Sequence, residues 1–519
     1  MSINLNFFRV TVTFLLLTVS SVAALAQRIH KNDIITDEKE LRKLAKAVES
    51  NPDSSGIHLA YIKAMGLDNP KLEAQYDTWI DKYPKSVTIP YALANVYVSH
   101  EYPKAKKYLL RSVEIDSNFA AGWAGLYQDA QRWGEFEAAG EYMGKAALAD
   151  PSEPLYAFYY ASSFVDKDWE RYVQMSLDLA NRFSEHDRGA QSLYWLAKRS
   201  KTEDEMMKYY ELLGQQFDPV KFAWSANGMM DYFNLLLNKD PQKALALSKE
   251  QAAKSGLDSE SAIGSRWVSL ASLAEHVLKA RKLMADNKGE EAAVVLSGIV
   301  VPRGFDFNKE LVLMKAEAAD IAGNTNAAYD SIMTAFTKRP NLKFKEGLLA
   351  YGNKMEKDSA AVNADILKKI YAGAKEATPF TLKNYYTNKD VSLANYKGKV
   401  LLLTYWFPGC GPCRAEFPHF ENVVKKFKDQ DLEYIGINIV PQQNDYVLPF
   451  MKSSGYSFTP LEDFRERVKG NLDNRGAAPV NFLIDKEGRV VFSNFRTDSD
   501  NEYELEMMID ILLKEVHSL

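Results

Sequence analysis

Cysteine is scarce in this chain: only two are present among 519 residues, Cys410 and Cys413. A structural zinc site closes with four ligands of the cysteine and histidine type, so two thiols alone do not build one. Two cysteines at C-x-x-C spacing can instead act as a dithiol switch, which opens and closes a single disulfide.

Charge of one sign is not in excess either, since 64 Lys and Arg stand against 69 Asp and Glu, a net charge of −5. This balance does not favour nucleic acid or an anionic membrane as a partner. Phosphate-binding glycine loops and a nucleophile elbow are missing, and the seven histidines do not form H-E-x-x-H. We therefore expect no metal and no cofactor other than the redox-active dithiol.

His419 is the one histidine close to the cysteines in sequence. A copper or zinc site made by Cys410, Cys413 and His419 is conceivable. Six residues past Cys413, however, place the imidazole nearly two helical turns from the sulfurs. We interpret His419 as a residue of a helix face.

The first 26 residues have the pattern of a cleaved signal peptide. Met1–Arg9 carries one positive charge, the apolar stretch Val10–Val22 follows, and Ala24-Leu25-Ala26 supplies an A-x-A cleavage pattern. The mature chain would start at Gln27, and the apolar stretch is short for a membrane span. We expect an exported protein, periplasmic or else extracellular, without a stable membrane anchor after cleavage. Disulfides persist in such compartments, so an unidentified thiol electron donor would have to supply reductant.

Residues 27–375 show helical spacing without strand alternation, and helix-ending residues recur about every 33–34 positions. Each repeat would be a helix pair that needs a neighbour to bury its other face, which predicts an all-α solenoid. The repeats resemble tetratricopeptide repeats, with a possible break near residues 251–265. The recurring breaks are Asn51-Pro52, Tyr83-Pro84, Asp116-Ser117, Asp150-Pro151, Phe183-Ser184 and Asp218-Pro219.

The concave face of such a solenoid commonly binds peptides, so we expect this region to bind or position a partner protein. Several aromatic residues could line a groove, although packing between helices is the simpler interpretation for each of them. They are Trp123, Trp133, Tyr159, Tyr160, Trp195, Trp224 and Tyr232.

The two cysteines lie at a predicted strand-to-helix junction. The run Lys399–Trp406 is apolar, rich in β-formers and bounded by Pro408, and helical apolar spacing follows over Arg414–Phe427. Pro412 fits the first turn of that helix, where its missing N–H is no loss. Cys410 therefore lies at the N-terminus of the helix.

That position has a chemical consequence for the thiols. The positive end of a helix lowers the pKa of a thiol from about 8.5 into the range where thiolate is populated at neutral pH. Cys410 is thus the expected nucleophile. Cys413, one turn into the helix and less exposed, could attack a mixed disulfide on Cys410 and release the reduced partner. The pair would carry two electrons.

Several motifs occur in order around the dithiol: Val391-Ser-Leu-Ala-Asn-Tyr-Lys-Gly-Lys-Val400, Trp406, the C-G-P-C segment followed by Arg414-Ala-Glu-Phe-Pro418, and Ala478-Pro479-Val-Asn-Phe-Leu-Ile484. Together they resemble the extracytoplasmic TlpA-like thiol:disulfide oxidoreductases of the thioredoxin superfamily. The resemblance covers residues 376–519 and implies an α/β thioredoxin-fold domain. It also implies that Pro479 lies in a cis-proline loop flanking Cys410, with Trp406, Gly411 and Pro412 as supporting residues.

Two positions depart from the family pattern. Gly409 stands where Trp commonly precedes the first cysteine, and Thr404 stands where thioredoxin itself carries a buried acid. Glu416 is the candidate to replace that buried acid as the base, because TlpA-like proteins have an active-site glutamate three residues after the second cysteine. If half-buried, its pKa would rise and it could carry the proton of Cys413. The alternative is a first-turn glutamate that serves only the helix dipole.

The predicted fold class is thus an all-α tetratricopeptide-like solenoid followed by an α/β thioredoxin-fold domain. The first functional hypothesis is an exported oxidoreductase that reduces or isomerises disulfides in a protein client, because Gly-Pro is the dipeptide of reducing thioredoxins. A thiol peroxidase of the same superfamily is the second, although its nucleophile normally follows Thr-x-x and Cys410 follows Phe407-Pro-Gly. The third is a solenoid binding protein whose thioredoxin-like domain is redox-inactive.

Overall fold

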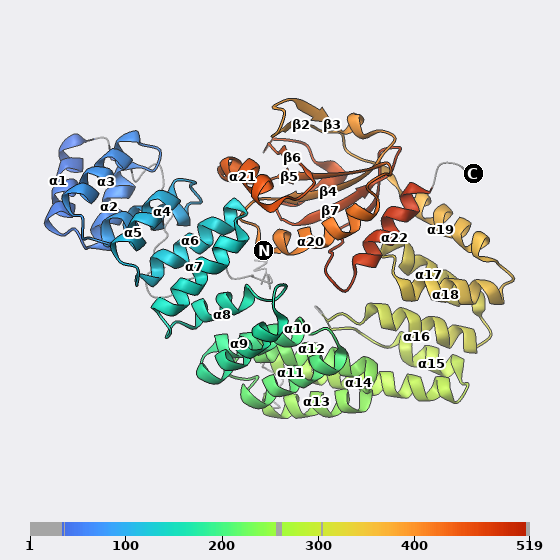
Figure 1. Ribbon diagram of the computed structural model, residues 1–519. Coiled ribbons are helices and arrows are strands. Elements are labelled where there is room, and N and C mark those ends of the chain that lie inside the picture. Colours follow the sequence, from blue (N-terminus) through green and yellow to red (C-terminus); the bar gives the residue numbers. More distant parts are fainter. Residues whose placement is uncertain (1–33, 36, 256–261, 303–304, 465, 515–519) are drawn as a thin grey trace, which may run out of the picture. The chain divides into compact units, whose positions relative to one another are not determined.

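A computed structural model describes residues 34–514 apart from 36, 256–261, 303–304 and 465 (Figure 1). The predicted signal segment, residues 1–26, lies outside the described residues. The chain divides into two compact units, Met1–Ala130 with Phe136–Ser163 and Gln131–Glu135 with Phe164–Leu519. Each unit is described by itself.

The first unit is helical, and several of its consecutive helices pack against each other. Its core holds large aromatic side chains that are fully buried, among them Tyr76, Trp79 and Tyr97. The helices are α1 (Glu38–Ser50), α2 (Ser55–Met65), α3 (Pro70–Lys82), α4 (Thr88–Ser99), α5 (Ala105–Ile115), α6 (Ala120–Trp133), α7 (Phe136–Ala149) and α8 (Pro154–Ser162).

The second unit continues with helices and ends in a sheet domain. In its helical part, each helix again contacts the next one along the chain. The helices are α9 (Trp169–Arg182), α10 (Asp187–Lys198), α11 (Glu203–Gln216), α12 (Ala223–Lys239), α13 (Pro241–Lys254), α14 (Ala262–Ala285), α15 (Gly289–Ser297), α16 (Asn308–Ile321), α17 (Thr325–Lys338), α18 (Leu342–Lys354) and α19 (Ser359–Gly373).

The predicted repeat breaks coincide with helix ends. Asn51, Tyr83, Asp116 and Phe183 are the C-caps of α1, α3, α5 and α9. Many of the helices have an N-cap residue whose side chain accepts a hydrogen bond from a backbone N–H of the first turn. Such a cap stabilises a helix by about 1 kcal/mol. These N-caps include Asp37, Asn69, Asp168, Thr202, Asp240, Asn324, Asn341 and Asp358.

The C-terminal part is an α/β domain built on an eight-stranded sheet of order β1-β8-β7-β4-β5-β6-β2-β3. Strands β4, β5 and β6 are parallel, and the other pairings are antiparallel. The strands are β1 (Lys375–Glu376), β2 (Thr381–Asn384), β3 (Asp390–Ser392), β4 (Val400–Trp406), β5 (Leu432–Asn438), β6 (Thr459–Glu462), β7 (Val480–Ile484) and β8 (Arg489–Ser493). The helices are α20 (Gly411–Lys426), α21 (Asn444–Ser454) and α22 (Glu502–Leu513), with 3-10 turns at Leu393–Tyr396, Pro441–Gln443 and Gly470–Leu472.

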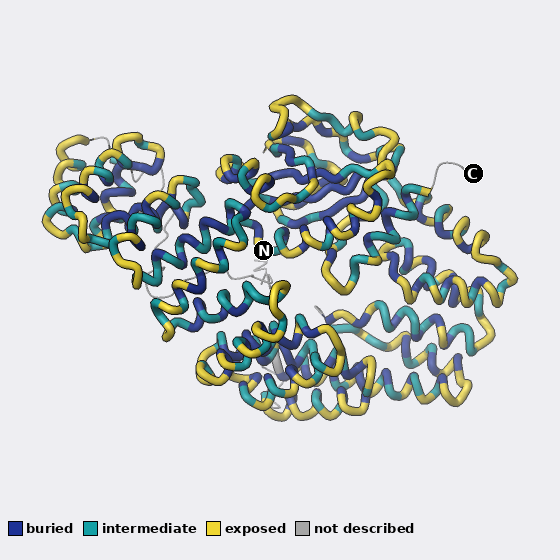
Figure 2. The backbone as a smooth tube through the Cα atoms, in the orientation of Figure 1, coloured by how far each residue is buried: buried dark blue, intermediate teal, exposed yellow. Residues whose placement is uncertain are grey.

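Strand β4 is the centre of this domain, and all seven of its residues are buried (Figure 2). Leu401, Leu403 and Tyr405 join an apolar cluster on one face of the sheet. On the other face Trp406 packs against Phe417 of α20, with ring centroids 5.6 Å apart. The prediction of a helical region followed by an α/β thioredoxin-type domain is confirmed.

The passage from the helices to the sheet is short. Helix α19 ends at Gly373, and β1 begins two residues later, forms one edge of the sheet and pairs with β8. The predicted boundary between residues 375 and 376 falls within β1. Across the described ranges, no helix has both the length and the apolar character needed to cross a membrane.

The close contact of α15 with α16 can be tested at Gly289. A Cβ at this position would come within 2.4 Å of the Ala322 amide nitrogen and 2.6 Å of the Ala318 carbonyl oxygen. Backbone atoms cannot move aside alone, so Gly289→Ala should lower the free energy of unfolding by roughly 1–3 kcal/mol in urea denaturation. Gly298→Ala is the control, because its nearest neighbour would lie 3.5 Å away. Equal stability of the two variants would show that this packing constraint is absent.

Candidate active site

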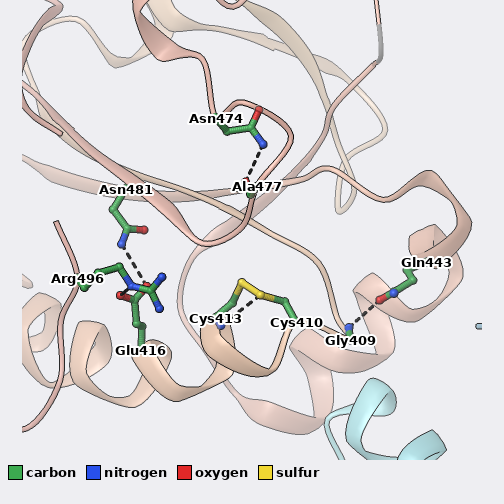
Figure 3. Close-up of a disulfide and its surroundings, with 9 residues drawn as sticks. All are labelled: Gly409, Cys410, Cys413, Glu416, Gln443, Asn474, Ala477, Asn481 and Arg496. Atoms are coloured by element: carbon green, nitrogen blue, oxygen red, sulfur yellow. Dashed lines mark hydrogen bonds and ion pairs between the residues drawn. A yellow bond between two sulfur atoms is a disulfide. The ribbon is translucent and has the colours of Figure 1, made fainter. Parts of the chain in front are cut away.

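The two cysteines lie where β4 passes into α20, as the sequence predicts. Cys410 is the N-cap of α20, and Pro412 lies in its first turn. Cys410 and Cys413 form a disulfide with their Cα atoms 5.3 Å apart (Figure 3). The backbone N–H of Cys413 donates to Cys410 Sγ at 3.2 Å. In the reduced state this N–H and the helix dipole would favour the thiolate of Cys410.

Both cysteines are well covered by protein. Cys410 is 2% exposed and Cys413 is 0% exposed. The sequence predicts Cys413 to be the less exposed of the two, and the order agrees, but the difference is small. Behind them, Trp406 is fully buried among aromatic rings, with Phe450 at 5.2 Å and Phe458 at 4.9 Å between centroids. The supporting role predicted for Trp406 therefore corresponds to a place in the aromatic core beneath the dithiol loop.

Gly409 has a specific partner. Its N–H donates to Oε1 of Gln443 at 2.6 Å, and Gln443 is fully buried at the start of α21 (Figure 3). A Cβ on Gly409 would lie 3.0 Å from Nε2 and 3.1 Å from Oε1 of that carboxamide. The carboxamide of Gln443 therefore takes the space into which a larger side chain at Gly409 would project.

The Ala478–Pro479 peptide bond is cis. Pro479 directly precedes β7, whose first residue Val480 pairs with Tyr405 near the end of β4. Pro479 therefore stands beside the strand end that leads to Cys410. The preceding turn is held by Asn474, whose side chain donates to the carbonyl oxygen of Ala477 at 2.8 Å (Figure 3).

Glu416 lies one turn beyond Cys413 on α20 and is more deeply buried than expected, with only 3% of the residue exposed. Its Oε1 accepts from Arg496 Nε and from the Thr497 amide at 3.1 Å, and its Oε2 accepts from Asn481 Nδ2 at 3.1 Å. Burial raises the pKa of Glu416, while the Arg496 charge and the three hydrogen bonds oppose that rise. A carboxyl group with a pKa brought toward neutrality suits proton transfer.

His419 points elsewhere. Its Nδ1 lies 2.7 Å from Oε1 of Glu502 on α22, so the imidazole takes part in packing α22 against α20. This contact matches the interpretation of His419 as a helix-face residue.

Sequence reasoning did not identify Asn481, Arg496, Gln443 or Asn474. Asn481 has one local signal, because it is a polar residue inside the apolar run Val480–Ile484, and it pairs in register with Thr404. Arg496 and Gln443 have no such signal, since they lie 80 and 34 residues from the groups that they contact.

Comparison with known proteins concerns this α/β domain. Residues 374–493 match the AhpC/TSA family. The thiol-disulfide oxidoreductase ResA of Bacillus subtilis (strain 168) is 35% identical over 138 residues, which are 25% of this chain and 75% of that protein. ResA of Geobacillus kaustophilus is 33% identical over 116 residues, 22% of this chain and 66% of that protein. A thioredoxin-family thiol:disulfide interchange protein of known structure from Chlorobium tepidum TLS shares 23% identity over 27% of this chain and 97% of its own, at a TM-score of 0.24.

A helix-capping Cys-x-x-Cys disulfide on a sheet of this topology defines a thiol-disulfide oxidoreductase with a thioredoxin fold. The sequence match to ResA over three quarters of that protein makes the assignment more specific. The chain belongs to the family of thiol-disulfide oxidoreductases that includes ResA.

The contact between Gly409 and Gln443 can be tested by Gln443→Ala. The substitution would remove the acceptor of the Gly409 N–H and leave a void, which should lower the free energy of unfolding by about 1–3 kcal/mol. Gln442→Ala is the matched control, because Gln442 is exposed. Urea denaturation of both oxidised variants measures the difference. A midpoint for Gln443→Ala equal to that of Gln442→Ala would contradict the stabilising role.

Proposed function

We propose that this protein is an exported thiol:disulfide oxidoreductase that reduces or isomerises disulfides of a protein client through Cys410 and Cys413. The observation that carries this proposal is the pairing of a helix-capping disulfide with a buried carboxyl group one turn further along the same helix. We assign Cys410 as the nucleophile, Cys413 as the resolving thiol and Glu416 as the proton carrier, with Pro479 flanking the nucleophile. The dithiol itself would be the only electron carrier required.

In the reducing direction, the Cys410 thiolate attacks one sulfur of the client disulfide. A Cys410–client bond forms, the client disulfide breaks, and one client sulfur leaves as thiolate. Glu416 accepts the proton of Cys413, and the Cys413 thiolate then attacks the Cys410 sulfur. The Cys410–Cys413 disulfide forms and the second client thiolate leaves, so two electrons have passed to the client. A thiol electron donor outside this chain must then reduce the disulfide again.

Export is supported by the signal-like pattern of residues 1–26 and the A-x-A sequence before Gln27. An oxidising compartment is also where this activity is needed, because disulfides form there and a reduced dithiol can reduce the incorrect ones. Cleavage at that site would leave no stable membrane anchor. The charge balance makes nucleic acid an unsuitable partner.

We assign the helical repeats the role of binding or positioning the client. Their helix pairs are of the kind that present extended binding surfaces. In the second unit Tyr194, Trp195 and Trp224 are only partly buried and cluster together, with Tyr194 and Trp224 centroids 5.1 Å apart. Tyr232, by contrast, is 8% exposed and belongs to the interhelical core.

Disulfide reduction by the purified reduced protein tests the activity. Wild type should accelerate the reduction of insulin disulfides by dithiothreitol, and Cys410→Ser should fall to the uncatalysed rate because it lacks the nucleophile. Precipitation of the insulin B chain reports the rate. Wild-type activity no greater than that of Cys410→Ser would refute the proposal. It would favour the alternative hypothesis of a solenoid binding protein whose thioredoxin-like domain is redox-inactive. Rapid peroxide consumption instead would favour the thiol peroxidase.

A trapping experiment tests the client and the export together. Cys413→Ser, expressed in the exporting host, cannot resolve a mixed disulfide, so Cys410 should remain bound to its client. Mass spectrometry of the non-reduced adduct should show a chain that starts at Gln27 joined to a second protein. Cys410→Ser with Cys413→Ser is the control. The client proposal would be withdrawn if both variants yielded the same adducts, and the export proposal if residues 1–26 were retained.

A further inference from the structure

The ionised form of Glu416 is the one that the surrounding atoms fit. Arg496, Asn481 and the Thr497 amide all donate N–H groups to the carboxyl oxygens. The orientation of the Asn481 amide is fixed, because its Nδ2 also donates to the Phe495 carbonyl oxygen at 2.9 Å. An ionised carboxylate only accepts hydrogen bonds, so these donors match it better than the protonated acid.

Among the described residues, Arg496 is the only charged side chain that bonds Glu416 directly. Cys413 lies one turn before Glu416 on the same helix, and the buried phenol of Tyr434 on β5 feels the Glu416 charge. Burial raises the pKa of Tyr434 well above its ordinary value, so that it stays neutral. The Arg496 side chain is 52% exposed, whereas that of Glu416 is 4% exposed. The positive charge thus reaches the buried carboxylate from the surface.

The segment that carries Arg496 is held in place on both sides. The Asn494 amide donates to the backbone carbonyl of Asn481 at 2.9 Å, and the Asn481 side chain donates to Phe495. Beyond Arg496, the Asn501 side chain donates to the Arg496 carbonyl oxygen at 3.2 Å. The guanidinium is therefore presented to Glu416 by an anchored loop.

We propose that Arg496 is a positioning residue for the resolving step: it keeps the buried Glu416 aimed and ionised, so that Glu416 can take the proton of Cys413. This inference rests on the proposed function of Cys410, Cys413 and Glu416. Only the ionised carboxylate can accept that proton, and an unpaired buried carboxylate would hold a proton of its own at neutral pH. Arg496 would thereby set the pH above which Cys413 resolves a mixed disulfide.

The two thiol steps can be separated with dithiobis(nitrobenzoate), an aromatic disulfide, mixed in equal amount with the reduced full-length protein. Attack by Cys410 releases the first thionitrobenzoate, and attack by Cys413 on the Cys410 adduct releases the second. The first phase reports the nucleophile and the second reports the resolving step. Stopped-flow absorbance across a pH series gives the midpoint at which the second phase gains its rate.

Arg496→Gln should move this midpoint to higher pH by about one to three units, because the opposing charge that lowers the pKa of Glu416 is lost. The first phase should change by less than about twofold. Arg496→Lys keeps the positive charge, so its midpoint should lie close to that of the wild type. Arg496→Met is a second neutral variant, which keeps the apolar stem of the side chain and should shift the midpoint as Arg496→Gln does. Lys428→Gln, which removes an exposed charge from the same domain, should leave the midpoint unchanged.

Glu416→Gln distinguishes this role from a structural one. It should abolish the inflection, and adding Arg496→Gln to it should have no further effect on the second phase. A midpoint in Arg496→Gln and Arg496→Met equal to that of the wild type would overturn the inference, as would a shift that persists without Glu416. A first phase no faster in wild type than in an unfolded thiol would instead refute the proposed function.

Discussion

The structure of the α/β domain depends on one buried strand. β4 is covered along its whole length and pairs with β5 on one side and β7 on the other. Its end fixes where the chain must turn into α20, and α20 then fixes Cys410 as its N-cap. The chemistry of the dithiol is therefore set by core packing, since a helix end pointed at the sulfur is the consequence of where β4 stops.

Around this strand, several buried polar groups are satisfied by segments distant in sequence. Glu416 is bonded from the segment after β8, and Gly409 is bonded by Gln443 at the start of α21. The loop before Pro479 is stabilised in the same way, because Arg467 lies buried between Asp463 and the Tyr405 hydroxyl. Leaving such groups without partners would cost about 1–3 kcal/mol each. The site is thus stabilised by the need to satisfy buried polar atoms.

The helical units follow a simpler logic, because their contacts run mostly between neighbours along the chain. Local signals then suffice: Asn51 and Tyr83 end helices, and Asp37 and Asn69 begin them. Such an array leaves broad surfaces whose partners depend on side chains rather than on the fold. For this reason the helices could be predicted from the residues that begin and end them, while the client that the array binds remains a proposal.

The sequence by itself determined the two classes of fold, the buried strand that ends at Trp406, and the position of Cys410 at a helix start, because periodicity, Pro412 and C-x-x-C spacing are local patterns. It also indicated Glu416, though as half-buried rather than 3% exposed. Only the tertiary structure showed the partners of Glu416 and of Gly409. Arg496 and Gln443 reach them across 80 and 34 residues of chain, and such contacts are decided by how strands and loops pack rather than by any local pattern.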